Sequence, residues 1–280
     1  MFEVSDPIAL YDIAFCDLDG TISTYDRKVR PAVLEAMKDV IAAGKWITVC
    51  TGRGYQTLSP FLEQVPVNAP LILCNGALIV EPSSRKVLEF HPMPLRLVHG
   101  LMHLALQEEL ELWIYLDDLE TMVQHKPSSH YFTLERPGKA SQDVPDPYRL
   151  VSRSPHKVAF LAERQADTQR VVEILERCVE GSARIVISSP RVLEVIMPGI
   201  SKAQAIARVA AMLGVEQDKT LAVGDGDNDV EMISWAGKGI AMGNATPLAV
   251  KAAEWVAPSI DQDGLAVVLR KFMIPALTLR

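Results

Sequence analysis

The sequence predicts an α/β protein whose core is a doubly wound parallel sheet with helices on both faces, interrupted by an inserted α+β module. Two observations predict this fold class. Short apolar runs alternate with segments of helical period in the first and last parts of the 280-residue chain, which is typical of βαβ units. The segment between them has a different pattern. With 49% apolar residues, the chain can bury a core together with an inserted module.

The first pattern along the chain is that of a βαβ unit. Residues 11–18, YDIAFCDL, are predicted to form a strand, residues 31–44 a helix, and residues 45–52 a second strand. Gly44 follows the last apolar position of the helix, where glycine is the usual C-cap. Gly52 ends the second strand and releases the chain into a loop. Two loops are therefore expected at the carboxyl ends of two strands.

A hairpin is expected over residues 69–82, APLILCNGALIVEP. Its two apolar runs are joined by Asn75 and Gly76, and an Asn-Gly pair tolerates the positive φ angles of a tight turn. We interpret Asn75 as a turn residue and leave it out of the candidate site.

The inserted module is predicted to span residues 84–191, between a first core part (1–83) and a second core part (192–280). Within it, short strands and at least two helices flank a polar stretch that contains proline. From residue 192 onward the βα rhythm returns. The elements expected there are a helix over 201–214, a strand over 219–226 and a helix over 227–237.

Polar clusters follow three of the predicted core strands. They are DLDGT (17–21), TGR (51–53) and GDGDND (224–229), and a lone Lys202 opens a core helix. The carboxyl ends of parallel strands meet at one edge of the sheet, which is where such folds bind ligands. We therefore expect these clusters to share one pocket.

Four carboxylates are expected in this pocket, those of Asp17, Asp19, Asp225 and Asp229. Acids this close repel one another and raise each other's pKa unless a cation is bound. One or two carboxylates, waters and a substrate phosphate are the usual ligands of Mg²⁺. The sequence therefore predicts a magnesium site.

The remaining polar groups are those that phosphoryl chemistry requires. Thr51, the Gly52 amide and Lys202 supply donors and positive charge for a phosphate. A cation is unfavourable at a helix N-terminus, so a bound anion explains Lys202 better than a solvated surface position does. The Asp17 carboxylate is placed to attack phosphorus, and Asp19, on the same loop, suits general acid/base work.

In this order, DLDGT, TGR, Lys202 and GDGDND resemble the four motifs of the haloacid dehalogenase superfamily, most closely its Cof-type phosphatases with a type IIB cap. The resemblance extends to Asn75-Gly76, to PGISK (198–202) and to the segment 224–264. It implies a Rossmann-like core with a mobile α+β cap inserted between the second and third motifs. A lone Asp-x-Asp pair also occurs in glycosyltransferases and polymerases, so the joint occurrence of the motifs favours the phosphatase.

By matching position, the resemblance implies a role for each motif residue. Asp17 would be the nucleophile and Asp19 the acid/base. Mg²⁺ would be held by the Asp17 carboxylate, the Asp19 carbonyl and Asp225, with Asp229 in support. The residues that would hold the phosphate are Thr51, Gly52, Arg53, Lys202 and Asn228.

The function predicted from the sequence is magnesium-dependent hydrolysis of small phosphomonoesters, such as sugar phosphates, pyridoxal phosphate or FMN, through a phospho-aspartate. Two rivals stay open: a phosphomutase of the same superfamily, and a non-catalytic regulator that binds phosphorylated metabolites. The fold does not name the substrate. The cap residues that could face it are His125, His130, Tyr131, Arg136 and His156.

Composition limits the partners and the compartment. The net charge is −7 and no long run of Lys or Arg forms the basic face that nucleic-acid binding needs. No stretch approaches the length of a membrane span, and residues 1–15 lack the basic and apolar regions of a secretory signal. We expect a cytoplasmic monomer or homodimer that acts on a small phosphorylated metabolite, with neither nucleic acid nor membrane as a partner.

Overall fold

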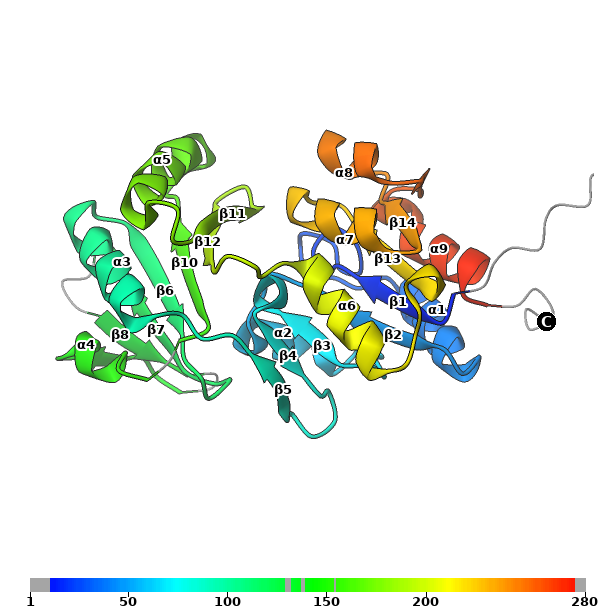
Figure 1. The fold of residues 1–280 in the computed structure, drawn as a ribbon, viewed down its shortest axis with the longest axis horizontal. Coiled ribbons are helices and arrows are strands. Elements are labelled where there is room, and N and C mark those ends of the chain that lie inside the picture. The colour runs from blue at the N-terminus through cyan, green and yellow to red at the C-terminus, as the bar shows by residue number, and fades with distance from the viewer. Residues whose placement is uncertain (1–10, 129–131, 137–138, 154, 275–280) are drawn as a thin grey trace, which may run out of the picture.

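The computed structural model describes residues 11–128, 132–136, 139–153 and 155–274, which form two lobes of different architecture (Figure 1). The core lobe contains a five-stranded parallel sheet of order β15-β14-β13-β1-β2. The cap lobe contains a seven-stranded sheet in which every neighbouring pair is antiparallel. The predicted α/β class with a parallel central sheet is therefore confirmed.

Strand β1 lies inside the core sheet, where it pairs with β13 on one side and with β2 on the other. All four of its residues are buried, as expected of a parallel strand that is covered on both faces. The core strands are β1 (Ile13–Cys16), β2 (Trp46–Val49), β13 (Thr220–Gly224), β14 (Lys238–Ala241) and β15 (Trp255–Val256).

Helices cover the two faces of this sheet. Ala14 and Cys16 of β1 pack into one apolar cluster, whereas Ile13 and Phe15 pack into another, because successive side chains of a strand point to opposite faces. The helices of the first cluster are α1 (Pro31–Ala42) and α9 (Gly264–Phe272), and those of the second are α6 (Lys202–Met212) and α7 (Val230–Trp235). Helix α2 (Tyr55–Leu62) also packs into the first cluster, and α8 (Pro247–Ala252) completes the lobe.

The predicted hairpin is present as an antiparallel pair, β3 (Leu71–Leu73) and β4 (Leu78–Val80), to which β5 (Val87–Phe90) adds a third strand. Cys50, the residue after β2, forms a parallel bridge with Ile72 of β3. This bridge joins the small sheet to the edge of the core sheet that β2 forms. The hairpin therefore holds its turn next to the loop that follows β2.

The cap sheet carries its two long helices, α3 (Leu95–Gln107) and α5 (Thr168–Val179), packed against one face. Its edge next to the core is formed by β11, which contacts the loop before α7. The strands are β6 (Glu111–Tyr115), β7 (Met122–His125), β8 (Phe132–Glu135), β9 (Gln142–Val144), β10 (Lys157–Leu161), β11 (Arg184–Ser189) and β12 (Val192–Ile196); α4 (Pro147–Leu150) lies between β9 and β10.

The boundaries predicted at 83/84 and 191/192 stay a prediction, and strand pairing favours a different placement. Strand β5 follows residue 84 but pairs with β4 of the core side, and β12 follows residue 192 but pairs with β10 and β11 of the cap. Periodicity alone does not tell which sheet an apolar strand joins. We propose that the cap comprises the chain between β5 and α6.

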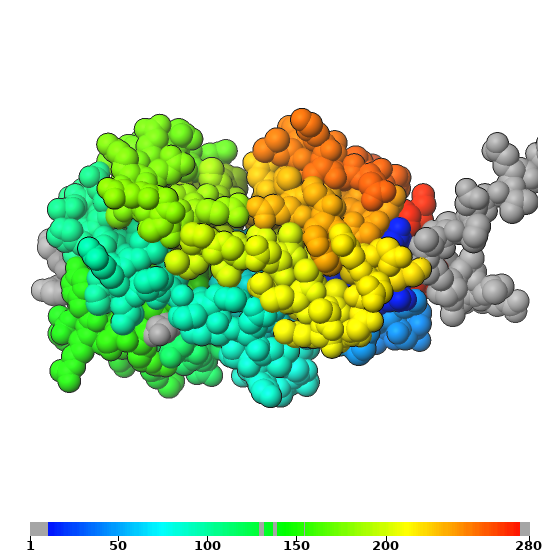
Figure 2. Space-filling model, viewed as in Figure 1, coloured from blue at the N-terminus to red at the C-terminus, as the bar shows by residue number. Residues whose placement is uncertain are grey.

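The two lobes are in contact along their junction, where the chain that leads from β12 to α6 crosses the visible face (Figure 2). Within the described ranges, no helix has the length and apolar character needed to cross a membrane.

Candidate active site

The predicted polar clusters gather at the carboxyl edge of the core sheet. Asp17 directly follows β1, and its backbone N–H donates to the Val223 carbonyl at 2.9 Å, which ties this loop to β13. Asp225 directly follows β13, and Lys202 is the first residue of α6. Ser201 caps that helix by accepting a hydrogen bond from the backbone N–H of Gln204.

The Lys202 ammonium lies between two carboxylates. Its Nζ is 2.5 Å from Asp17 Oδ1 and 2.5 Å from Asp229 Oδ1, and it is fully shielded from solvent. The other oxygen of Asp229 accepts hydrogen bonds from the backbone N–H groups of Asp225 and Gly226, at 3.0 and 2.9 Å. Asp229 thus fixes both the lysine and the loop that carries Asp225.

Asp17, Asp225 and Asp229 can each bring one carboxylate oxygen to within 4.8 Å of the others, and all three residues are buried. Burial raises the pKa of Asp17 well above its usual value and raises that of Asp225 to about 6, and neighbouring acids add to both shifts. One lysine does not balance three carboxylates. These oxygen donors and this excess of negative charge fit a Mg²⁺ ion.

Three further side chains hold Asp225. Two of them were not predicted from the sequence, and the third, Thr21, was given no role. The Tyr25 hydroxyl donates to Asp225 Oδ2 at 2.6 Å, the Thr21 hydroxyl donates to Oδ1 at 3.3 Å, and the Asn244 amide lies 3.4 Å from Oδ2. Thr21 belongs to the DLDGT cluster, so its position was a usable signal. Nothing in the local pattern marked Tyr25.

Asp19 lies apart from the three buried acids. Its carboxylate makes two bonds to the Arg53 guanidinium, from Nε at 2.7 Å and from Nη2 at 2.5 Å, and its side chain is 34% exposed. The Arg53 guanidinium also stacks over the Phe61 ring at 4.9 Å. The residue predicted to bind phosphate and the residue predicted to be the acid/base are thus paired with each other.

Of the other predicted phosphate-binding groups, Gly52 bonds directly to the cap, whereas Thr51 and Asn228 bond to core residues. The Thr51 hydroxyl oxygen accepts from the Arg53 backbone N–H at 3.1 Å, while the Gly52 carbonyl accepts from the Lys157 ammonium at 2.6 Å. The Asn228 amide donates to the Asn75 side-chain carbonyl at 3.1 Å. Asn75 and Lys157 were absent from the predicted site.

A cavity of about 270 Å³ opens between the lobes beside Lys202 and Asn228. Its core wall includes Asn75, and its cap wall is formed by the first four residues of β11 together with Ile196 of β12. The lining residues are Asn75, Arg184, Ile185, Val186, Ile187, Ile196, Ile200, Ser201, Lys202, Asp227, Asn228 and Glu231.

The cap residues suggested by sequence do not line this cavity where they are described. His125 and His156 are buried elsewhere, and Arg136 is exposed. His130 and Tyr131 lie outside the described residues. The cap wall instead consists largely of aliphatic residues, for which the sequence carried no chemical signal.

Comparison with known proteins gives concordant matches. The family model of the haloacid dehalogenase-like hydrolases matches residues 14–269. YxeH of Bacillus subtilis (strain 168) is 26% identical over 273 residues, covering 95% of this chain and 99% of that protein. The HMP-PP phosphatase of Yersinia enterocolitica is 28% identical over 246 residues, covering 85% and 86%. The structure of the subclass IIB sugar phosphatase BT4131 superposes with a TM-score of 0.72 at 20% identity, covering 92% and 98%.

Proposed function

The chain belongs to the haloacid dehalogenase-like hydrolase family, and we propose that it is a magnesium-dependent phosphatase that hydrolyses small phosphomonoesters through a phospho-aspartate on Asp17. One observation carries the proposal. The Lys202 ammonium contacts Asp17 and Asp229 at 2.5 Å each, with Asp225 beside them, at the carboxyl edge of a parallel sheet. This arrangement joins a carboxylate nucleophile, a fixed cation and acidic metal ligands in one buried place.

The first half-reaction transfers the phosphoryl group to the protein. An oxygen of Asp17 attacks phosphorus, the bond from phosphorus to the ester oxygen breaks, and the leaving oxygen takes a proton from Asp19. Lys202 orients Asp17 through the 2.5 Å bond to Oδ1. In the second half-reaction, water gives a proton to Asp19 and attacks phosphorus, which breaks the acyl-phosphate bond and releases phosphate.

Asp19 has to exchange its partner during this cycle. Both of its carboxylate oxygens accept hydrogen bonds from Arg53, whereas the first half-reaction needs one of them to deliver a proton to the leaving oxygen. A bound phosphoryl group competes for the same guanidinium, because arginine pairs with phosphate as readily as with carboxylate. Substrate binding therefore draws Arg53 away and frees Asp19 to carry the proton.

The residues fit for Mg²⁺ are Asp17, Asp225 and Asp229. When bound, the ion supplies positive charge between the carboxylates and the phosphate oxygens, where negative charge would otherwise repel the nucleophile from its target.

The cavity supports a small leaving group. At about 270 Å³ it lies at the small end of ligand pockets, which run from about 300 to 1,000 Å³. The relatives named for HMP-PP and for sugar phosphates support a small phosphorylated metabolite as the substrate class.

The test is phosphate release from a panel of sugar phosphates, pyridoxal phosphate, FMN, nucleotides and p-nitrophenyl phosphate, with Mg²⁺ and then with EDTA. We expect metal-dependent release that Asp17→Asn abolishes, and a phosphoryl group on the Asp17 peptide after acid quenching. Asp39→Asn, an exposed acid of α1, is the matched control. Metal-dependent release that survives Asp17→Asn would overturn the mechanism. Conversion of a hexose 1-phosphate into its 6-phosphate would favour a phosphomutase.

A further inference from the structure

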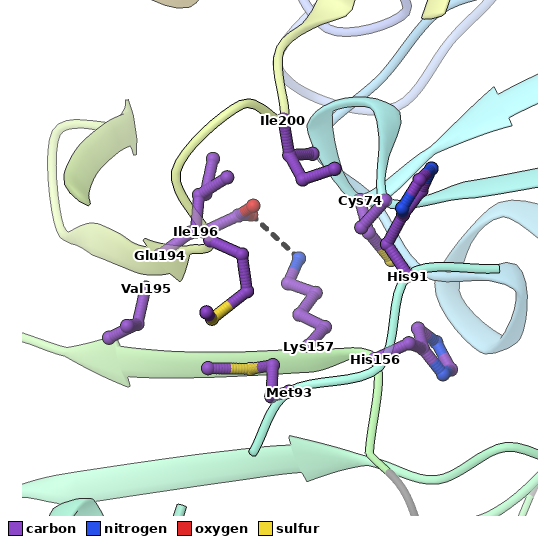
Figure 3. A pocket seen from close by; sticks show the side chains of 11 residues that line it. Cys74, His91, Met93, His156, Lys157, Glu194, Val195, Ile196 and Ile200 are labelled. Atoms are coloured by element: carbon purple, nitrogen blue, oxygen red, sulfur yellow. Dashed lines mark hydrogen bonds and ion pairs between the residues drawn. The ribbon is translucent and has the colours of Figure 1, made fainter. Parts of the chain in front are cut away.

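A buried chain of polar side chains connects the cap with both phosphate-binding loops of the core. Lys157 begins β10 and Glu194 lies in the middle of β12, and Figure 3 shows their charged ends pointing toward each other beside the turn that carries Cys74. The chain continues from Glu194 through Asn75 to Asn228, and from Lys157 to Gly52.

The cap supplies the charged centre of this chain. Lys157 Nζ is 2.6 Å from Glu194 Oε1, and the two side chains are only 6% and 3% exposed. Ala159 lies opposite Glu194 in the sheet, so Lys157, two residues earlier, projects from the same face. Burial lowers the pKa of Lys157, but Glu194 together with Tyr115 and Cys74 outweighs it and the pKa stands above its usual value, so the ammonium stays charged.

One arm of the chain fixes a peptide group. Lys157 donates to the Gly52 carbonyl at 2.6 Å, and the N–H on the other side of the same peptide, that of Arg53, donates to the Thr51 hydroxyl oxygen at 3.1 Å. A trans peptide is planar, so holding its carbonyl also fixes the direction of its N–H. Because the Thr51 oxygen accepts this bond, its O–H is left to donate to a phosphate.

The other arm fixes an amide. An ionised carboxylate only accepts hydrogen bonds, so Asn75 turns its amide nitrogen toward Glu194 Oε2, at 2.6 Å. The Asn75 carbonyl then faces Asn228 and accepts from its amide nitrogen at 3.1 Å. Asn75 is 2% exposed and has a φ of 54°, a conformation that asparagine tolerates. Through Asn75, the charge of Glu194 sets the orientation of Asn228.

We propose that Lys157, Glu194 and Asn75 are positioning residues that orient Thr51 and Asn228 for phosphate, so that the phosphate-binding groups are organised only while the cap is docked on the core. The inference rests on the proposed function, since Thr51 and Asn228 are its phosphate-binding groups. Docking of the cap and assembly of the phosphate site are then one event, and a substrate that draws the cap down completes its own site.

A variant of Asn75 separates positioning from mere stability. Aspartate has the size of asparagine and tolerates this φ angle, but Asn75→Asp places a second carboxylate beside that of Glu194. We expect kcat to fall about 10- to 100-fold, the usual scale of a small misplacement at a reacting centre, and the affinity for inorganic vanadate to fall by a similar factor. The affinity for Mg²⁺ alone, measured by calorimetry, should stay unchanged, because the magnesium carboxylates are not touched.

The sharpest test exchanges the two groups. In the double variant Asn75→Asp/Glu194→Gln, the new amide donates to the new carboxylate, and the number of charges is preserved. Its amide oxygen still accepts from Lys157, and Asn228 still has an acceptor. We expect at least about tenfold recovery of kcat over Asn75→Asp, since the complementary pair is restored.

Ser188→Ala is the control, because it removes a 3.0 Å bond to Glu194 but keeps the Cβ that lies beside Gly52 and leaves the bonds of Lys157, Glu194 and Asn75 to the two loops in place. It should keep the kcat and vanadate affinity of the parent. The arm through Gly52 is tested with Lys157→Met/Glu194→Gln, which leaves no unpaired buried charge and should still lose kcat. Parent-like kcat and vanadate affinity in Asn75→Asp, or no recovery in the exchanged pair, would overturn the inference while leaving the phosphatase intact. A parent protein that releases no phosphate from any substrate would overturn the proposed function itself.

Discussion

Lys202 and Lys157 are both buried, but their surroundings differ in charge balance. Lys202 contacts two carboxylates, with that of Asp225 close by, so its site holds an excess of negative charge. Lys157 meets one carboxylate, that of Glu194, and a neutral carbonyl, so its site is balanced. The first site would need a further cation to balance its charge, whereas the charges of the second site already balance each other.

The pKa shifts of Asp17 in the first site and of Lys157 in the second also differ in their effect on charge. The pKa of Asp17 is raised, first by burial, so folding disfavours the ionised form of the proposed nucleophile. The pKa of Lys157 is raised against the effect of its burial, so folding favours the charged form. In the core site folding opposes the charge of Asp17 but favours that of Lys202, whose pKa is raised by Asp17 and Asp229 against the effect of burial, while in the junction site the lysine charge is held by Glu194.

The largest expected effect is on turnover in the unbalanced site. Asp17→Asn should lower kcat at least about 10³-fold, because the nucleophile is lost. The same change should leave the melting temperature in the absence of metal unchanged or raised, because it removes one of the mutually repelling carboxylates. Thermal unfolding beside the activity assay checks both parts. A variant that melts several degrees lower would show that the Asp17 charge stabilises the fold.

The balanced site should respond in the opposite way. Glu194→Gln leaves the Lys157 ammonium buried with no counter-charge, and breaking a buried ion pair in this manner costs about 3–5 kcal/mol. Urea unfolding should show this loss, whereas Ser188→Ala should cost only about 1 kcal/mol, the value of one hydrogen bond. Equal losses in the two variants would contradict the idea that the charge of Glu194 matters.

The two sites also differ in how far the sequence could predict them. Asp17, Asp225 and Lys202 stand at the ends of strands and at the start of a helix, and parallel strands bring such positions to one edge. Local pattern and fold class were therefore enough to bring them together. Their predicted roles stay predictions.

The junction could not be predicted in this way. Asn75 and Glu194 are 119 residues apart, and their contact depends on how the cap docks, which no local pattern encodes. One signal was present: Lys157 and Glu194 interrupt two apolar strands, and a charge inside a buried strand needs a partner. The Asn75-Gly76 pair was interpreted as a turn. This interpretation is right for the backbone, but it gave no role to the buried side-chain amide of Asn75.

A smaller effect is expected from His156, which lies beside Lys157 at the junction. Neither of its ring nitrogens has a hydrogen-bond partner among the described residues, and burial, followed by the Lys157 charge, lowers its pKa from 6.5 to about 4. Because the unfolded chain binds this proton more readily, folding stability should fall as the pH drops from about 6.5 toward 4. Between pH 7 and pH 5 the loss from this residue is about 2 kcal/mol.

His156→Phe should flatten this pH dependence, because phenylalanine keeps the ring contacts with Phe90 and Tyr115 but takes up no proton. Urea unfolding of both proteins across this pH range measures the difference. A variant whose stability falls with acid as steeply as that of the parent would assign the dependence to other groups.

The smallest effect is expected at the exposed edge of the same junction. Arg184 of β11 lies 2.8 Å from Glu231 of α7, but the two side chains are 51% and 46% exposed. Solvent and salt screen such a pair, so Arg184→Ala should cost less than about 1 kcal/mol, and less still at high salt. Urea unfolding at low and high salt measures this cost. If the loss matched that of Glu194→Gln, the lobes would be held together by their exposed edge, and docking of the cap would no longer depend on the buried pair that also reaches the phosphate-binding loops.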